Sequence, residues 1–314
     1  MRVVTGQFKS ILRFGVLLVA TGLFLLMGFL NVSKPGSHIV GCPRACAPMM
    51  ASKDNREIIV MSLNILHGFP NFEHLEARLA MIASEIQHQQ ADIVCLEEVP
   101  WRPGMGSAAE YLAKQTGMNY VYLRANGNRK MIRFEEGSAI LSRYPIKRTD
   151  FTELMPQAGF FEHRIVLHAV VEAPHGDLDV FVTHLTHRGE ATNAGQAANL
   201  QRYVIENRTN FAIVAGDFNA VEEQPQIIAL TNQWIDAYRA IHPHEAGMTC
   251  CIDDVTAVPG EGLENRIDYI FLAPIYNNDL ELVRVRSILE QPLLDRSGWL
   301  WASDHIGLLA VLKY

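Results

Sequence analysis

Acidic, amide and imidazole side chains recur at the ends of apolar runs in this chain. In IVAGDFNA, residues 213–220, Asp217 and Asn219 follow a run of small and branched apolar residues. Because side chains alternate between the two faces of a strand, Asp217 and Asn219 share one face and Phe218 points to the other. A carboxylate beside an amide at a strand end is suited to binding a polar ligand.

The same kinds of residue occupy other strand ends. Asn64 follows MSL, Glu97 and Glu98 close DIVCL, His184 closes DVFVT, Asp268 lies in RIDYIF, and Asp304 and His305 precede the run IGLLAVLKY. If these strands end at one edge of the fold, the polar side chains meet on one rim, where sites on rigid scaffolds usually lie. Each residue alone is compatible with a structural role, such as a turn cap at Asp217. Their convergence is what indicates a site.

Strand-like segments alternate with amphipathic helices along the chain. Strands are expected at residues 58–66, 91–99, 120–124, 138–143, 164–172, 178–184, 211–219, 266–272, 281–288 and 306–314, and helices at 72–89, 107–116 and 193–207. The helix over 72–89 places Leu75, Leu79, Ile82 and Ile86 on one face. Strands interleaved with helices predict two sheets packed on each other with helices outside.

The N-terminal segment is predicted to direct export. Arg2, Lys9 and Arg13 precede an uncharged run over residues 14–32, close to the ~20 apolar residues that span a bilayer. A basic flank before such a run is typical of a signal peptide or signal anchor. We expect residues 1–33 to be a signal with a transmembrane helix, 34–55 a linker and 56–314 the catalytic domain, either membrane-anchored outside the cytoplasm or secreted after cleavage. A buried core helix, and lipidation at Cys42 in IVGC, are the alternatives.

The charge of the chain disfavours one class of partner. The net charge is −7, and the first 50 residues carry five basic charges and no acidic one, so the rest of the chain is at −12. Such a negative net charge is unfavourable for a nucleic-acid-binding protein, because neutralisation of the phosphates dominates its affinity. The basic residues between Arg124 and Arg148 form either an ordinary solvated surface or a local grip on an anionic substrate.

The cysteines show no spacing typical of a zinc site. Cys42 and Cys46 could pair in an exported protein, and Cys95 lies in an apolar run. Cys250 and Cys251 are adjacent, and a disulfide between neighbouring residues is uncommon.

The motifs together resemble the endonuclease/exonuclease/phosphatase superfamily, which includes pancreatic deoxyribonuclease, exonuclease-III-like repair nucleases, neutral sphingomyelinases and inositol polyphosphate 5-phosphatases. The matching pieces, in chain order, are SLNILHG, DIVCLEEV, GSAILSRYPI, VTHLTH, GDFNA, NRIDYIFL and SDHIG, from residue 62 to 307. The resemblance implies a four-layered α/β sandwich, with two mixed sheets face to face and helices outside. It also implies phosphoester hydrolysis with a divalent ion, usually Mg²⁺, with Mn²⁺ or Ca²⁺ as alternatives.

The resemblance also implies roles for individual residues. The metal ligands are Glu98, Asn64 beside it, and Asp304; Glu97 stands where the family usually has glutamine. Asp217 and Asn219 match the pair that orients the attacking water and contacts the phosphate, His184 matches the histidine that stabilises the phosphoryl oxygens, and Asp268 matches the acid that pairs with His305. Hard oxygen ligands suit Mg²⁺, and a histidine held by a carboxylate can act as a general base. Whether His305 or Asp217 takes the proton of water is left open.

The sequence therefore predicts a metal-dependent phosphodiesterase. A membrane tether and a local basic grip favour a lipid headgroup or small-molecule phosphodiester as substrate. An exported DNase-like nuclease acting on nucleic acid, and a catalytically inactive binding scaffold of the same fold, are the alternatives. His67, His187 and Arg164 lie close to motif residues, either as contacts on the rim or as solvated neighbours. The oligomeric state is left open.

Overall fold

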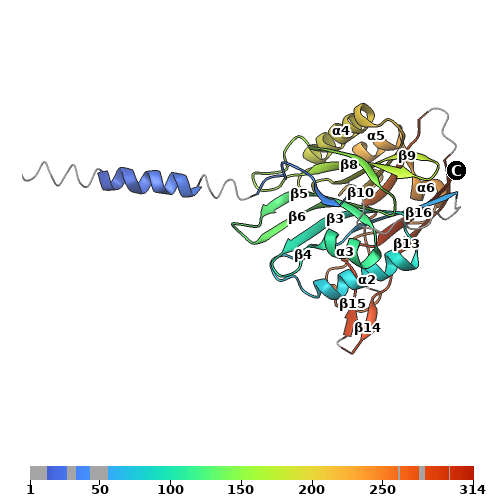
Figure 1. The fold of residues 1–314 in the computed structure, drawn as a ribbon, viewed down its shortest axis with the longest axis horizontal. Helices are drawn as coiled ribbons and strands as arrows, with labels where there is room; N and C mark the ends of the chain where they lie inside the picture. Colours follow the sequence, from blue (N-terminus) through green and yellow to red (C-terminus); the bar gives the residue numbers. More distant parts are fainter. Residues whose placement is uncertain (1–12, 27–32, 43–55, 261, 276–279, 297) are drawn as a thin grey trace, which may run out of the picture.

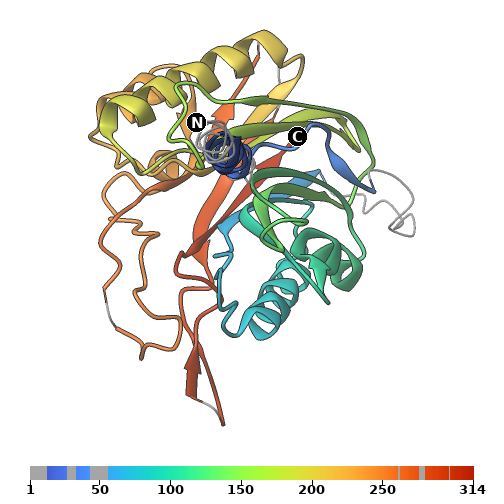
Figure 2. The same ribbon diagram turned by 90° about the vertical axis from the view of Figure 1, so that its left-hand side faces the viewer.

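Two mixed β-sheets lie face to face, and helices cover the outer side of each (Figure 1). The computed structural model describes residues 13–26, 33–42, 56–260, 262–275, 280–296 and 298–314. Figure 2 shows helix α4 (Glu190–Asn207) on the opposite side of the sheets from α2 (Leu75–His88) and α3 (Ala108–Thr116). The prediction of a layered α/β sandwich with helices outside is confirmed.

The larger sheet has eight strands and carries α2 and α3 on its outer face. Its order is β1 (Val40–Cys42), β5 (Asn119–Asn128), β6 (Phe134–Ser142), β3 (Ile93–Arg102), β2 (Glu57–Asn64), β16 (Gly307–Lys313) and β13 (Glu281–Ile288), and β4 (Gly106–Ser107) pairs with β3. Leu79 and Ile82 of α2 and Leu112 of α3 pack against it. The amphipathic pattern of the 72–89 segment therefore faces this sheet, as its period of 3.6 residues predicts.

The smaller sheet has six strands and carries α4 and α5 (Pro225–Thr231). Its order is β11 (Ile235–Asp236), β12 (Asp268–Ala273), β10 (Phe211–Asp217), β9 (Gly176–His184), β8 (Ile165–Ala173) and β7 (Ile146–Glu153). A short helix, α6 (Ala237–Ile241), follows β11. The strands β14 (Leu293–Asp295) and β15 (Gly298–Leu300) form a separate hairpin that projects from the sandwich (Figure 2).

The central strands are buried on both faces. In β10, Ile213 and Ala215 belong to the core between the sheets, whereas Ala212 and Val214 pack in the layer under α4. A strand covered on both sides has a continuous apolar sequence instead of an alternating one. This explains why β10 is apolar from Phe211 up to the polar residues at its end.

The N-terminal expectation needs a correction. Residues 13–26 form an exposed helix, which at 1.5 Å per residue measures about 21 Å, against the ~30 Å hydrocarbon core of a bilayer. In the described part of the chain no helix is long and apolar enough to cross a membrane, so the prediction of a transmembrane helix is wrong. Residues 27–32 of the apolar run and 43–55 of the predicted linker lie outside the described residues. Export by an N-terminal signal stays a prediction from the sequence.

A buried arginine joins α2 to two loops at one edge of the sandwich. The Arg78 side chain donates through Nη1 to the carbonyl oxygens of Ile65 at 2.8 Å and Ala302 at 3.3 Å, and through Nη2 to that of Leu66 at 2.9 Å. Only 1% of Arg78 is exposed, so water does not replace these partners. Arg78 therefore holds the loop after β2 against the loop that precedes Asp304.

We expect Arg78→Met to lower the free energy of unfolding by about 3 kcal/mol, because each buried polar group left without a partner costs ~1–3 kcal/mol. Urea unfolding followed by circular dichroism measures the change. Arg102→Met is the matched control, since Arg102 pairs with Glu76 at the surface and such pairs contribute at most ~1 kcal/mol. Equal losses in the two variants would contradict the structural role given to Arg78.

Candidate active site

Three strand ends of the smaller sheet bring polar side chains together. β9 and β10 are parallel, with His184 opposite Asp217 at their C-terminal ends. β12 runs antiparallel to β10 and begins with Asp268 opposite Asp217. Because two strands end and one begins at this edge, the three side chains lie next to one another.

The larger sheet supplies the other half of the site. β2 and β3 are parallel, and Asn64, the last residue of β2, lies opposite Glu97 in the middle of β3. β16 pairs antiparallel with β2, so Asp304 and His305, immediately before β16, reach the same edge. The predicted convergence of strand-end residues on one rim is therefore what the structure has.

A β-bulge in β3 separates the two adjacent glutamates. The register shifts between Leu96 and Val99, and Glu98 has a φ of 53°, the left-handed conformation that a bulge tolerates. Glu98 lines an open cleft, whereas Glu97 is fully buried and reaches toward Gly216 in the other sheet. A Cβ at Gly216 would lie 1.9 Å from the Thr183 carbonyl oxygen and 3.2 Å from Glu97 Oε1. Only glycine therefore fits at position 216 between these two residues.

Glu97 is a buried acid with no hydrogen-bond partner in the described part of the chain. Burial, together with the negative charges of Asp268 and Asp217, raises its pKa well above the ordinary value. Its environment therefore favours the neutral carboxylic acid form of Glu97, which lies beneath the site and not in it. A neutral carboxylic acid has the shape and lack of charge of glutamine, the residue that the family usually has at this position.

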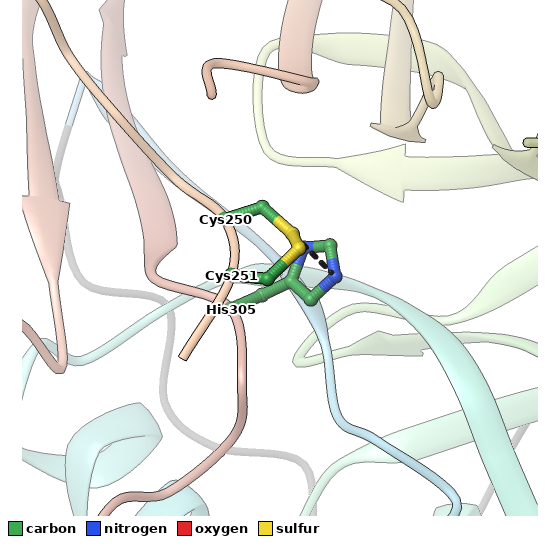
Figure 3. Close-up of side chains that lie close together, drawn as sticks. All are labelled: Cys250, Cys251 and His305. Carbon is green, nitrogen blue, oxygen red and sulfur yellow. Dashed lines mark hydrogen bonds between the residues drawn. A yellow bond between two sulfur atoms is a disulfide. The ribbon is translucent and has the colours of Figure 1, made fainter. Parts of the chain in front are cut away.

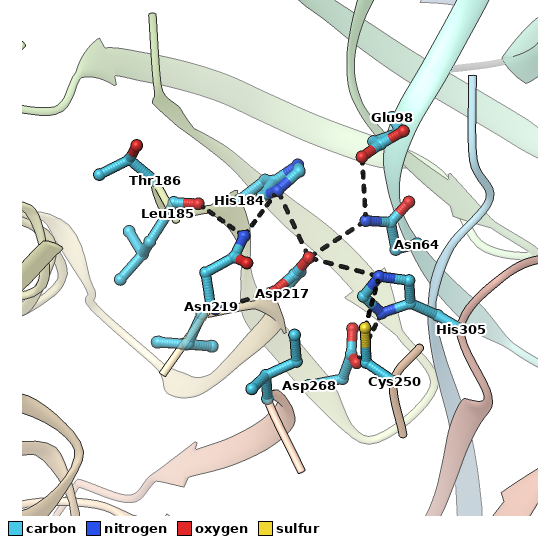
Figure 4. Close-up of polar contacts among 12 residues, drawn as sticks. Asn64, Glu98, His184, Leu185, Thr186, Asp217, Asn219, Cys250, Asp268 and His305 are labelled. Atoms are coloured by element: carbon cyan, nitrogen blue, oxygen red, sulfur yellow. Dashed lines mark hydrogen bonds and ion pairs between the residues drawn. The ribbon is translucent and has the colours of Figure 1, made fainter. Parts of the chain in front are cut away.

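Asp217 is the centre of the polar network (Figure 4). Its Oδ2 accepts from Asn64 Nδ2 at 3.1 Å and lies 3.3 Å from His184 Nε2 and 3.8 Å from His305 Nε2, while Oδ1 accepts from the Asn219 backbone N–H at 2.8 Å. Burial raises the pKa of Asp217 to about 7, helped by the charge of Asp268 and opposed by His305. Asp217 can thus bind or release a proton near neutral pH.

His305 is held by a carboxylate on its other side. Its Nδ1 lies 2.8 Å from Asp268 Oδ2 and donates to it. Burial alone would lower the pKa of His305, but the carboxylates of Asp268, Asp217 and Asp304 raise it well above the ordinary value. These carboxylates therefore favour the imidazolium form of the ring, whose Nε2–H lies on the side of Asp217.

His184 and Asn219 form a neutral pair at the opposite wall. Asn219, with a φ of 48°, directs its Nδ2 to the Leu185 carbonyl oxygen and to His184 Nε2, each at 3.0 Å. Burial lowers the pKa of His184 well below the ordinary value, and the charge of Arg164 lowers it further. The neutral ring accepts at Nε2, which leaves Nδ1–H without a partner among the residues that the structure describes.

Glu98 and Asp304 provide oxygen donors of the kind that divalent ions prefer. Glu98 is ionised, because His67 and His305 lower its pKa despite the opposing effect of burial. Burial raises the pKa of Asp304, and the charge of Glu98 raises it further. Two carboxylates that repel each other in this way would be stabilised by a cation, so the residues fit a metal ion.

The other predicted ligand, Asn64, has a different orientation. Its Nδ2 donates to Glu98 Oε1 at 3.4 Å as well as to Asp217, and its Oδ1 accepts from the Leu66 backbone N–H at 3.1 Å. Asn64 thus orients the two carboxylates, and direct ligation would require its amide to turn over. Asp217, Asp268 and His305 form a second group whose ligand atoms lie within 4.8 Å of one another.

The cleft above these residues has a volume of about 660 Å³ and walls that the sequence analysis did not identify. Phe69, Phe160 and Phe161 are exposed beside it. Glu162 Oε1 accepts from Thr186 Oγ1 at 2.8 Å and Arg164 Nη2 at 2.9 Å, and its Oε2 lies 2.7 Å from Arg188 Nε. His67, His187 and Arg164, which the sequence placed near the site, also line the cleft. No periodic pattern marks residues 155–163, which is why this wall was missed.

None of the basic residues between Arg124 and Arg148 lines the cleft, although Asn126, Phe134 and Glu136 of the same segment do. Arg124 and Arg129 both pair with Glu135, and Lys147 pairs with Asp177. These ion pairs favour the interpretation as ordinary surface over the interpretation as a grip on the substrate. The positive charge at the cleft comes from Arg164 and Arg188 instead.

Comparison with known proteins identifies related sequences and folds. Residues 61–305 match the model of a family described as the Endonuclease/Exonuclease/phosphatase family, whereas no curated protein matches the chain. Humanized D. rerio TDP2 is similar with a TM-score of 0.65 at 17% identity, covering 83% of this chain and 100% of that one. A mannosyl-6-phosphatase from Bacteroides thetaiotaomicron gives 0.62 at 17% identity, covering 82% and 100%. At such identities the structural likeness concerns the fold alone.

The His305–Asp268 pair leads to a prediction about titration. In Asp268→Asn, we expect the pKa of His305 to fall markedly, because burial remains and the closest carboxylate charge is gone. The titration of the His305 Cε1–H resonance in metal-free protein measures the pKa. Asp304→Asn should lower it less, since Asp304 contributes less to the shift. An unchanged pKa in Asp268→Asn would show that the imidazolium is stabilised elsewhere.

Proposed function

The chain belongs to the endonuclease/exonuclease/phosphatase family, and we propose that it is a metal-dependent phosphodiesterase. The observation that carries this proposal is the convergence, from both sheets, of ionised, neutral and cationic groups at one cleft. Glu98, His184, Asp217, Asn219 and His305 line the cleft. Asp268 lies behind His305, and Asp304 interacts with Glu98 and His305. An anionic ester attacked by water needs groups that accept a proton, groups that stabilise growing charge, and a cation.

A divalent ion fits Glu98 and Asp304, and Mg²⁺ is the ion we propose, with Mn²⁺ and Ca²⁺ as alternatives. Mg²⁺ is often held by one or two carboxylates and keeps several waters, which matches this sparse set. When bound, the ion neutralises charge on the phosphoryl oxygens and on the leaving oxygen. Asn64 supports this role by fixing the orientation of Glu98.

The protonation states of Asp217 and His305 support Asp217 as the general base. His305 is an imidazolium and cannot accept a further proton, whereas Asp217, with a pKa of about 7, is partly ionised and can take the proton of water. The imidazolium N–H of His305 then stabilises the negative charge that remains. Asn219 and His184 lie on the other side of Asp217 and line the cleft. There a phosphoryl oxygen would replace His184 Nε2 as the acceptor of the Asn219 Nδ2–H.

Adjacent glutamates offer a matched test of this mechanism. We expect Glu98→Gln to lower metal-dependent hydrolysis of bis-p-nitrophenyl phosphate at least 100-fold, because a metal ligand and its charge are removed. Glu97→Gln should change it less than threefold, because Glu97 is already neutral and buried. Initial rates of the full-length chain with Mg²⁺ and with EDTA measure both effects.

Two outcomes would overturn the mechanism. Equal rates in wild type and Glu98→Gln would exclude Glu98 from the site, and activity that persists in EDTA would exclude the metal. Metal binding without turnover of any phosphoester would instead indicate a binding scaffold of the same fold.

The walls of the cleft favour an ester with an apolar group. Phe160 is 57% and Phe161 41% exposed, and both lie beside the phosphate-binding residues. Arg164 and Arg188 both pair with Glu162, so the three residues leave one net positive charge at the cleft for an anion. The aromatic rings supply apolar area for the rest of the molecule. We therefore favour a lipid phosphodiester, and the net charge of −12 beyond residue 50 disfavours a polynucleotide.

We expect the double variant Phe160→Ala/Phe161→Ala to reduce turnover of phospholipid vesicles about tenfold, since two partly buried aromatic contacts are lost. Turnover of bis-p-nitrophenyl phosphate should fall much less, because it engages little of the wall. Val283→Ala is the control, since Val283 is 48% exposed and lies on β13 away from the cleft. The comparison uses vesicles of sphingomyelin and of phosphatidylinositol.

A nuclease is the second candidate. The structure of D. rerio TDP2, which matches with a TM-score of 0.65, contains a single-stranded DNA product. Cleavage of plasmid DNA faster than of either lipid, with binding that weakens steeply as salt rises, would favour the nuclease and contradict the lipid assignment.

A further inference from the structure

Two adjacent cysteines lie in the cleft against His305. Cys250 and Cys251 are joined by a disulfide (Figure 3), and both line the cleft. Cys250 forms a β-bridge with His305, and the Ile306 N–H donates to the Thr249 carbonyl oxygen at 2.7 Å. The backbone therefore fixes the cysteines relative to the imidazole.

The geometry of these groups is that of a metal site with soft ligands. Cys250 Sγ lies 3.5 Å from His305 Nε2, and one ligand atom from each of Cys250, Cys251 and His305 lies within 4.8 Å of the others. A tetrahedral zinc ion with bonds of ~2.3 Å to sulfur and ~2.0–2.1 Å to nitrogen separates the two atoms by about 3.6 Å. The observed separation is already close to that value.

The surroundings of His305 complete such a site. Its Nδ1 donates to Asp268 Oδ2, which leaves Nε2 as the ligating atom on the side of the cysteines. A histidine bound to a metal usually donates its other N–H to a carboxylate, which fixes the ring and raises its basicity. Asp268 is thus already in the position of such a partner.

We propose that reduction of the Cys250–Cys251 disulfide creates a site for Zn²⁺, formed by both sulfurs and His305 Nε2, and that zinc bound there stops hydrolysis. A dithiol reductant is oxidised to its own disulfide, the Cys250–Cys251 bond breaks, and two thiols form with the two electrons and two protons transferred. Binding of Zn²⁺ then releases a proton from each thiol and the Nε2 proton of the His305 imidazolium. The three protein ligands leave a fourth position open.

Access to the disulfide is consistent with such chemistry. Cys251 is exposed, whereas Cys250 is fully buried, so a thiolate reaches the Cys251 sulfur first and displaces the sulfur of Cys250. Cys250 then remains beside His305. In the oxidised protein His305 Nε2 lies 3.8 Å from Asp217 Oδ2. Zinc bound to Nε2 would end the interaction of this nitrogen with Asp217.

The soft site differs from the hydrolytic metal site in ligand type. Glu98 and Asp304 offer oxygen atoms that suit Mg²⁺, whereas thiolates select Zn²⁺ and similar ions. The binding of a soft ion does not depend on the proposed hydrolase, and only the inhibition rests on that proposed function.

The test uses Co²⁺ as a spectroscopic substitute for Zn²⁺ in the full-length chain. After reduction with excess dithiol and its removal without oxygen, we expect one equivalent of Co²⁺ to give a thiolate-to-cobalt charge-transfer band that Zn²⁺ abolishes. The oxidised protein should give no band, and Cys251→Ser should lose it. Cys95→Ser and Cys42→Ser should retain it, because Cys95 is a buried free cysteine and Cys42 belongs to another disulfide.

Two results would overturn the site: no band in reduced wild type, or an equal band in Cys251→Ser. If that variant does not fold, alkylation of the reduced wild type serves instead and must abolish the band. With Mg²⁺ present, Zn²⁺ should lower hydrolysis at least tenfold in the reduced enzyme and much less in the oxidised one. A band without this inhibition would refute the inhibitory role. If the band appears in a protein that hydrolyses no substrate, the proposed zinc site is supported and the proposed hydrolase function is refuted.

Discussion

Burial of several carboxylates at one sheet edge is the constraint on which the site depends. Glu97, Asp217 and Asp268 are all buried. Burial raises the pKa of Glu97 and of Asp217, and the charge of Asp268 raises both further. An unpaired buried charge is expensive, so the chain compensates in different ways at each position. Glu97 is neutral, Asp268 pairs with an imidazolium, and Asp217 receives N–H groups from Asn64 and Asn219. The negative charge that remains is what a metal ion would balance.

Holding these groups apart requires backbone conformations that ordinary strands do not have. Glu98 and Asn219 both have positive φ values, which cost of order 1–3 kcal/mol each for residues other than glycine. The bulge at Glu98 turns one carboxylate into the cleft and leaves its neighbour beneath. Arg78 then fixes the adjoining loops by binding their carbonyl oxygens. The two sheets, packed through a continuous apolar core, stabilise the strained residues at their edge.

The sequence predicted the parts of the site that follow strand ends, because strand periodicity is local. The edge position of Asp217 follows from such a local pattern, whereas the separation of Glu97 from Glu98 depends on the β-bulge in β3. Contacts between distant segments could not be predicted in this way. The pairing of Arg124 with Glu135 instead of substrate, the wall at Phe160 and Phe161, and the approach of Cys250 to His305 depend on loops without a period. The apolar N-terminal run led to the wrong prediction of a transmembrane helix, because apolar composition alone does not fix the length of a helix.

His305 connects the two kinds of chemistry that this cleft can support. Its Nδ1 is committed to Asp268, so one nitrogen, Nε2, must serve either Asp217 or the sulfur of Cys250. With the disulfide intact, neither sulfur is a thiolate and the ring can keep its proton, which suits stabilisation of an anion. Once thiolates form, a soft ion competes with that proton for Nε2. A single imidazole nitrogen therefore links the redox state of two cysteines to the charge of the site, without any movement of the sheets.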